Sequence, residues 1–333
     1  MVAEHSCHLE TMNVELTTKC PLSCPQCYCT LSGGKDIPLD VAALRIREAS
    51  TLGVKEVMLS GGETLCYPYI YDVIKVAREC CDSVNVALSG VGFSQSVLDS
   101  LIDAGVTGIF ISLNGSTKEI NSYSRDGYEF AISALELLQK NAFPKTTVNW
   151  VMHSSNADDF PNMVSLAEKF DVYSLTILGL KPDSNHTLAT YPSKTQMINL
   201  KKALRAYKGN CLIQIESCFS PMLALYSDTK LFGNFNVSEY KGCGAGRTTV
   251  SVSVDGRLSP CRHLDYCESY GTIKEYMELS KMQQEIRELS DTRDSPCSLC
   301  RLKDYCRPCL AIDKKLYNNL HYSFSQCPIF ESV

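Results

Sequence analysis

The feature that most constrains the fold is a repeated alternation of short apolar segments with amphipathic ones. Between residues 12 and 208, six segments rich in Val, Ile and Leu are each followed by a segment whose apolar residues recur every three or four positions. This pattern favours parallel strands that are covered on both faces and connected by helices. The expected strands are residues 13–16, 54–59, 84–88, 109–113, 148–152 and 175–178.

The number of repeats limits how the strands can be arranged. Six strand–helix repeats are fewer than the eight of a closed barrel, so we predict an α/β fold with an open, partial (β/α)6 barrel. In folds of this kind, functional residues gather beyond the carboxyl ends of the strands. Residues that directly follow an expected strand are therefore the first candidates for a site.

The pattern changes after Gly209. Residues 248–254 alternate small polar and apolar side chains, Asp255-Gly256 is a turn signal, and residues 257–260 follow, which predicts a β-hairpin. We then expect a helix over residues 273–289 and a cysteine-rich tail with few apolar residues. Because such a tail cannot bury much of a core, bound metal would have to stabilise it. We predict a barrel domain over residues 1–210 and an iron–sulfur domain over residues 211–333.

Cysteine is the outlier of the composition. The 333 residues include 18 cysteines, concentrated in residues 20–29 and 243–327. The chain is 44% hydrophobic, which is enough for a core of its own, and it has no export signal, so we expect metal binding rather than a disulfide framework. A net charge of -5 does not favour nucleic acid, and no long apolar run indicates a membrane segment. We expect a cytoplasmic protein.

The first cysteine group directly follows the first expected strand. Cys20, Cys24 and Cys27 form a Cys-x3-Cys-x2-Cys loop. Each thiolate can hold one iron of a four-iron cube, which leaves the fourth iron open to a small molecule. A zinc site would require a fourth ligand, and Cys29 follows Cys27 too closely to complete a tetrahedron with Cys24 and Cys27. Buried structural cysteines would not account for three thiols in one Pro-rich loop.

This loop resembles the cluster motif of the radical S-adenosylmethionine (SAM) superfamily. Gly61-Gly62-Glu63, after the second strand, resembles the Gly-Gly-Glu segment with which the family receives the methionine amino group. The resemblance also implies ribose and carboxylate contacts at Ser89, Ser112, Asn114 and Arg125. The alternative for these residues is an ordinary loop role, because Gly, Ser and Asn are common in turns and a loop arginine is often solvated.

The resemblance implies both the cofactors and the reaction. The open iron of a [4Fe-4S] cluster would hold the amino and carboxylate groups of SAM. An electron from a donor such as flavodoxin or ferredoxin would then break the bond from the sulfonium to the 5′ carbon. The resulting 5′-deoxyadenosyl radical would remove a hydrogen atom from the substrate. One position departs from the family, which usually has an aromatic residue or histidine where this chain has Gln26.

The second cysteine group resembles the SPASM extension of peptide- and protein-modifying radical SAM enzymes. This extension usually houses two auxiliary [4Fe-4S] clusters, and here one or two are expected. The implied ligands are Cys297, Cys300, Cys306 and Cys327 for an outer cluster, and Cys243, Cys261 and Cys309 for an inner one. Cys267 is the nearest candidate for the missing inner ligand, followed by Cys218; without either, the inner cluster has an open iron. A zinc ribbon over residues 297–309 is the alternative.

The SPASM resemblance implies a peptide or protein substrate. We expect cross-linking, thioether formation or epimerisation in a ribosomally made peptide, and a thiol at Cys218 could return a hydrogen atom to a substrate radical. A buried structural cysteine is the alternative there. Only about a dozen residues precede the first strand, so leader recognition would fall to a separate leader-binding protein or to the barrel mouth, or would not occur. The rival functions are sulfatase maturation, by oxidation of a Ser or Cys, and a non-catalytic, zinc-stabilised binding protein.

Overall fold

The computed structural model describes most of the chain and sorts it into two compact units. The described residues are 8–29, 34–181, 190–216, 242–264, 266–289, 297–300, 303, 306–318 and 320. Unit 1 comprises Met1–Pro21, Cys29–Ile109 and Gly244–Glu288. Unit 2 comprises Leu22–Tyr28, Phe110–Cys243 and Leu289–Val333. The first cysteine loop therefore begins in unit 1 and continues in unit 2.

Unit 1 is built on a mostly parallel set of strands in the order β3-β2-β1-β8-β9. These strands are β1 (Thr11–Thr17), β2 (Glu56–Gly61), β3 (Ser83–Leu88), β8 (Thr249–Val252) and β9 (Leu258–Ser259). β1 pairs in parallel with both β2 and β8, and only β8 and β9 are antiparallel. Alternate residues of β1, namely Met12, Val14 and Leu16, are fully buried, as expected of a strand covered by helices.

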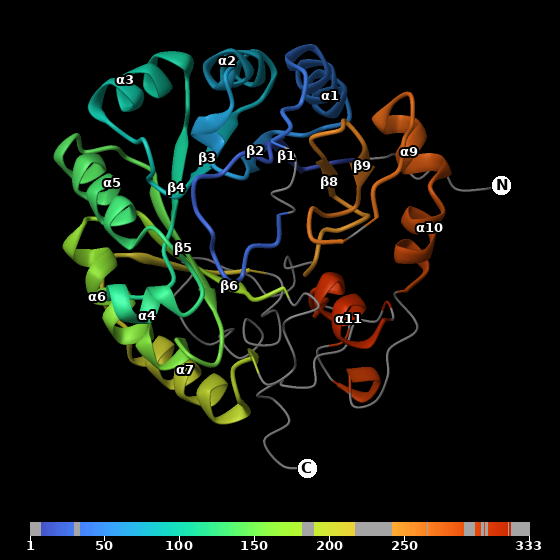
Figure 1. The fold of residues 1–333 in the computed structure, drawn as a ribbon. Helices are drawn as coiled ribbons and strands as arrows, with labels where there is room; N and C mark the ends of the chain where they lie inside the picture. Colours follow the sequence, from blue (N-terminus) through green and yellow to red (C-terminus); the bar gives the residue numbers. More distant parts are fainter. Residues whose placement is uncertain are drawn as a thin grey trace. The chain divides into compact units, whose positions relative to one another are not determined.

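Helices pack on the strands of unit 1 through one apolar face. They are α1 (Leu39–Thr51), α2 (Ile70–Cys80), α3 (Gln95–Ala104), α9 (Ile273–Leu279) and α10 (Lys281–Glu288). Figure 1 shows α1, α2 and α3 side by side along the parallel strands. α2 buries Ile70, Val73, Ile74 and Ala77, whose spacing is that of one helix face.

Unit 2 repeats the same construction. β4 (Gly108–Ser112) begins in unit 1 and ends in unit 2, where β5 (Thr146–Met152), β6 (Ser174–Gly179) and β7 (Leu212–Ile215) run parallel to one another. The helices are α4 (Lys118–Ser122), α5 (Tyr128–Lys140), α6 (Phe160–Lys169), α7 (Lys194–Ala206) and α11 (Leu310–Tyr317). Trp150 on β5 is fully buried and packs near Phe160, so β5 lies at the centre of this core.

The strands agree closely with expectation, and one helix does not. All six predicted strands are confirmed as β1 to β6, and the predicted hairpin is confirmed as β8 and β9. The prediction of one helix over residues 273–289 is wrong, because Ser280 has extended backbone angles and separates α9 from α10. The Ser280 hydroxyl accepts a hydrogen bond from the Gln283 N–H at 3.2 Å and so caps α10. The domain boundary near residue 210 stays a prediction.

Candidate functional site

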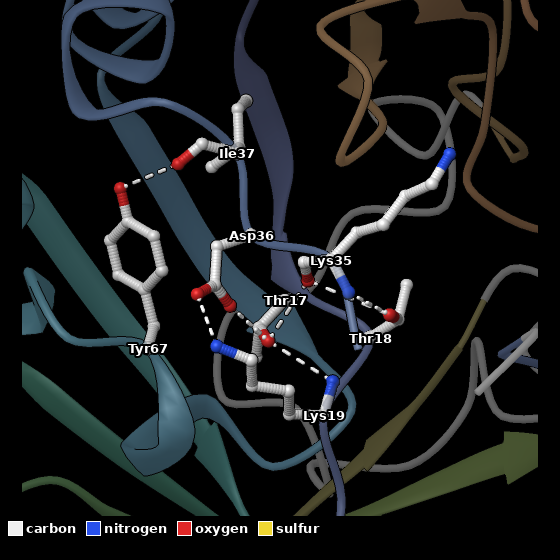
Figure 2. A network of polar contacts seen from close by, with 7 residues as sticks. All are labelled: Thr17, Thr18, Lys19, Lys35, Asp36, Ile37 and Tyr67. Atoms are coloured by element: carbon white, nitrogen blue, oxygen red, sulfur yellow. Dashed lines mark hydrogen bonds and ion pairs between the residues drawn. The ribbon is translucent and has the colours of Figure 1, made fainter. Parts of the chain in front are cut away.

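The chain that leads into the first cysteine loop is held by a polar network in unit 1. Figure 2 shows the carboxylate of Asp36 between Thr17 and Lys19: it accepts the Thr17 hydroxyl at 2.6 Å and pairs with the Lys19 ammonium at 2.5 Å. The Lys19 N–H in turn donates to the Thr17 hydroxyl at 3.0 Å. The residues directly before Cys20 are therefore fixed by side-chain hydrogen bonds as well as by β1.

A buried tyrosine supports the other end of this network. The Tyr67 hydroxyl donates to the Ile37 carbonyl at 3.0 Å, next to Asp36 (Figure 2). The Tyr67 side chain is 1% exposed. Burial, with a smaller contribution from Asp36, raises the pKa of Tyr67 to about 12. Tyr67 therefore acts as a neutral donor that holds the segment preceding α1.

The glycine pair after β2 permits a very close approach to the same residues. The Gly62 N–H donates to the Thr17 carbonyl at 2.7 Å, and the Glu63 N–H donates to the Lys19 carbonyl at 2.8 Å. A Cβ at Gly62 would lie 2.3 Å from the Lys19 carbonyl oxygen, and one at Gly61, where φ is 144°, would lie 2.4 Å from the Thr17 oxygen. Only glycine fits at both positions.

Two of the predicted SAM contacts meet in the core of unit 1. Glu63 is 1% exposed, and one of its carboxylate oxygens accepts both the N–H of Ser89, at 2.8 Å, and the Ser89 hydroxyl. The other oxygen accepts the Leu65 N–H at 3.3 Å. The structure thus joins the ends of β2 and β3 through these predicted site residues and fixes the direction of the carboxylate.

The second half of the cysteine loop is held within unit 2. The Cys27 N–H donates to the Cys24 carbonyl at 3.1 Å, which closes a turn between the two cysteines. The N–H groups of Ser23 and Gln26 donate to the Asp126 carboxylate at 3.0 Å and to the Ser124 carbonyl at 3.2 Å. Both thiol-bearing residues of this turn are partly exposed, as are most residues of the loop.

Asn114 is buried and bonded within the protein. It is 0% exposed; its amide nitrogen donates to the Ser124 hydroxyl at 3.0 Å, and its side-chain oxygen accepts the Val151 N–H at 3.0 Å. The side chain therefore links the end of β4 to β5. Ser112, the last residue of β4, is half-buried. Contacts of these two residues with SAM stay predictions.

A pocket with both polar and apolar lining lies beside the Cys24–Cys27 turn in unit 2. It has a volume of about 370 Å3, its open mouth included, and is lined by Pro25, Gln26, Tyr123, Ser124, His153, Ser154, Ser155, Leu180 and Thr190. The side-chain oxygen of Gln26, which lines the pocket, is buried and has no hydrogen-bond partner within the described part of the chain. The same holds for the Nε of Arg125, which follows the lining residue Ser124 but does not itself line the pocket. Because buried polar atoms are normally paired, these two suit a ligand that offers a hydrogen-bond donor and a negative group. The residues present therefore fit SAM.

The C-terminal cysteines are only partly described. Cys243 and Cys309 are buried, and the Cys243 N–H donates to the Arg307 carbonyl at 2.8 Å, so Cys243 lies beside the segment that carries Cys306 and Cys309. Burial raises the pKa of the Cys267 thiol. The predicted ligands Cys261, Cys297 and Cys300 are partly exposed. Cys218 and Cys327 lie outside the described residues.

The thiols do not converge on one point. Within the described ranges, no three His, Cys, Asp or Glu side chains are close enough to hold a single metal ion. The ligands of a four-iron cube each bind a different iron, so they are not required to converge in this way. The cluster ligand sets stay predictions.

Three ionisable residues that were not predicted lie beyond the later strands of unit 2. His153 directly follows β5, and Lys181 and Glu216 follow β6 and β7 as an ion pair in which the lysine side chain is 6% exposed. His153 and the side chain of Lys181 are buried, and buried ionisable groups at such positions are candidates for a site. The available signal was their place after an apolar strand, which had been used only for the first four strands.

Comparison with known proteins identifies a family domain in the N-terminal part of the chain. Residues 14–167 match the model of the radical SAM superfamily. The chain carries a radical SAM domain. The match implies SAM and a [4Fe-4S] cluster as cofactors, in agreement with the spacing of Cys20, Cys24 and Cys27 and with the Gly61-Gly62-Glu63 segment. It spans the polar network of Figure 2, the glycine pair and the turn between Cys24 and Cys27.

Longer alignments extend beyond this domain. The chain is 26% identical over 313 residues to the PqqA peptide cyclase of Gluconobacter oxydans (strain 621H), covering 87% of the chain and 82% of the relative. It is 23% identical over 316 residues to the AdoMet-dependent heme synthase of Methanosarcina barkeri (strain Fusaro / DSM 804), covering 89% and 90%.

Solved structures confirm the fold. Streptococcus suis SuiB bound to S-adenosylmethionine superposes with a TM-score of 0.76 at 17% identity, covering 96% of this chain and 77% of SuiB. Native anSMEcpe with bound AdoMet gives a TM-score of 0.72 at 16% identity, covering 94% and 93%. The predicted open α/β barrel is thereby confirmed.

In the ranges that the structure describes, no helix is both long enough and apolar enough to cross a membrane.

Proposed function

We propose that this chain is a radical SAM enzyme that modifies a ribosomally made peptide. The observation that carries this proposal is the extent of the similarity to PqqA peptide cyclase. The radical SAM domain accounts for residues 14–167, whereas the similarity to the cyclase covers 87% of the chain. The resemblance to a peptide-modifying enzyme therefore extends beyond the barrel into the cysteine-rich part that follows it.

Different residues bind the two cofactors. Cys20, Cys24 and Cys27 hold three irons of the cluster. Glu63, oriented by Ser89, accepts the ammonium group of SAM. When bound, the cluster and SAM supply a 5′-deoxyadenosyl radical that removes a hydrogen atom from the substrate. Cofactor enzymes depend on the protein for such binding and orientation, and for the exclusion of competing reactions.

Arg125 completes this set by binding the methionine carboxylate. Its Nε is buried without a partner in the described part of the chain. A guanidinium presents parallel N–H donors that match the two oxygens of a carboxylate. The other predicted SAM contacts are Ser112, the last residue of β4, and Asn114, two residues further on.

The C-terminal cysteines hold one or two auxiliary [4Fe-4S] clusters. The position of Cys243 beside the segment of Cys306 and Cys309 supports this assignment. Brown, oxygen-sensitive protein with about eight to twelve irons is expected if two or three four-iron clusters form. Colourless protein that contains only zinc would favour the binding-protein alternative. We also infer that the enzyme acts in the cytoplasm, with a reducing partner such as flavodoxin or ferredoxin and, where the peptide has a leader, a separate leader-binding protein.

The test requires a peptide substrate. The candidate is a short peptide encoded beside this gene, incubated with reconstituted enzyme, SAM and dithionite under anaerobic conditions. Cross-linking removes two hydrogen atoms from the peptide, whereas epimerisation leaves its mass unchanged except in D2O, where it incorporates deuterium. A Cys20→Ala variant should yield neither product, and Cys80→Ala, which changes a thiol outside the motifs, should behave as wild type. Oxidation of a sulfatase-derived peptide instead would establish the maturase alternative and overturn the proposal.

A further inference from the structure

A buried polar network stands at the ends of β4 and β5 in unit 2. Its members are almost fully enclosed: Asn114, Asn121 and Asn156 are at most 1% exposed, and Ser124 and His153 are 5% and 6% exposed. Five polar side chains so deeply buried cost free energy unless they are hydrogen-bonded to one another or to the backbone. The bonds that satisfy them therefore define what the network holds in place.

The hydrogen bonds determine which nitrogen of His153 carries its proton. The Ser155 N–H donates to His153 Nδ1 at 3.2 Å, so Nδ1 is the acceptor nitrogen of a neutral imidazole. Nε2 then carries the proton and donates to the Ser124 hydroxyl oxygen at 2.9 Å. The Asn114 amide donates to the same oxygen at 3.0 Å. Two donors, one following β4 and one following β5, therefore fix the position of Ser124.

Ser124 connects this network to the cysteine loop. Its carbonyl accepts the Gln26 N–H at 3.2 Å, between the two cysteines of the Cys24–Cys27 turn. Asp126, two residues further on, accepts the Ser23 N–H at 3.0 Å, but it is exposed to water and holds the loop less firmly. The buried contacts from the strand ends to the turn therefore meet at Ser124: one comes from His153 after β5 and the other from Asn114 after β4.

We propose that His153 and Ser124 are positioning residues for the cluster loop. They do not touch the iron; they hold the backbone turn that presents the thiolates of Cys24 and Cys27. Groups that orient metal ligands influence both cluster retention and reduction potential. This inference extends beyond the proposed function, because it concerns the cluster loop and is independent of the substrate.

The test separates the hydrogen bond of His153 from its bulk. His153→Gln retains a donor near Nε2, whereas His153→Leu fills similar space without one. Ser124→Ala removes the shared oxygen, and Ser174→Ala is its matched control, because Ser174 is a buried hydroxyl of the same unit that bonds only Thr147, at 2.8 Å, among the contacts described. Hydrogen exchange of residues 22–28 is measured in the full-length, anaerobically reconstituted protein. Exchange in α6 serves as the internal reference for folding.

The proposal expects exchange in residues 22–28 to be about tenfold faster in His153→Leu and Ser124→Ala, because each loses a buried hydrogen bond. The same two variants should alter the SAM-induced change in the electron paramagnetic resonance spectrum of the reduced cluster. His153→Gln and Ser174→Ala should match wild type in both measurements. Equal exchange in His153→Leu and His153→Gln, with α6 unchanged, would overturn the proposal. Loss of peptide modification alone would not, because neither measurement depends on turnover.

Discussion

Replacing Gly62 by alanine tests the packing of the cluster loop directly. The new Cβ would lie 2.3 Å from the Lys19 carbonyl oxygen, 0.7 Å inside the 3.0 Å below which such contacts are essentially never seen (3.0 − 2.3). The obstructing atom belongs to the backbone directly before Cys20, so it cannot rotate away as a side chain could. Moving it also stretches the bonds from Gly62 to Thr17 and from Glu63 to Lys19, which are 2.7 and 2.8 Å long.

Overpacking and two weakened hydrogen bonds together should lower the free energy of unfolding by about 2–4 kcal/mol. Urea denaturation of Gly62→Ala measures this loss, and iron analysis should show less than the wild-type content. Gly92→Asn is the control, because Gly92 has a left-handed φ of 74°, which asparagine tolerates, and a Cβ there would meet no atom within 4 Å. Gly62→Ala protein with wild-type iron content and a stability within about 0.5 kcal/mol of wild type would refute this reasoning.

Two further predictions concern unit 1, and a third concerns Cys211 in unit 2. A double-mutant cycle with Lys19→Met and Asp36→Asn should give a coupling below about 1 kcal/mol, because the two side chains are 45% and 22% exposed; a larger value would mean that the pair is shielded from water. Tyr67→Phe should destabilise by about 1–2 kcal/mol. Since burial raises the Tyr67 pKa from 10 to about 12, this stabilisation is complete below pH 10 and should fade as pH rises towards 12; unfolding curves that show a constant difference would contradict it. Burial raises the pKa of Cys211 to about 11, so alkylation at pH 8 should modify it only after unfolding, and rapid labelling of the native protein would be the contrary result.

The strands were predicted well because each one is encoded by a pattern in its own residues. β2 and β3 are short apolar runs, and the turn signal at Asp255-Gly256 was enough to predict the hairpin of β8 and β9. The parallel pairing of β8 with β1 could not be predicted from a local pattern, because the paired residues Thr11 and Thr249 are 238 residues apart in the sequence. The break between α9 and α10 at Ser280 was not predicted, because the apolar residues on both sides of Ser280 keep helical spacing. Its extended backbone and the hydrogen bond from the Gln283 N–H to its hydroxyl are seen only in the structure.

The candidate site also has features that the sequence predicts and features that only the structure reveals. The spacing of the cysteines singled out the cluster loop, because each thiolate of such a loop can hold a different iron. Resemblance to the radical SAM superfamily singled out the Gly61-Gly62-Glu63 segment. The place of His153 after an apolar strand was visible in the sequence, but its hydrogen bond to Ser124, 29 residues away, was not. The hydrogen bonds of Asn114, which join β4 to β5, could not be read from the sequence, and its contact with SAM stays a prediction.

The most direct test of the account is the formation of 5′-deoxyadenosine. Full-length protein is reconstituted with iron and sulfide without oxygen, then mixed with dithionite and SAM, and the products are separated by chromatography. We expect 5′-deoxyadenosine and methionine from wild type, and neither from a variant in which Cys20, Cys24 and Cys27 are replaced by alanine. Iron bound by the C-terminal cysteines should persist in that variant. Well-loaded wild-type protein that forms no 5′-deoxyadenosine would contradict the assignment of this loop as a radical SAM site.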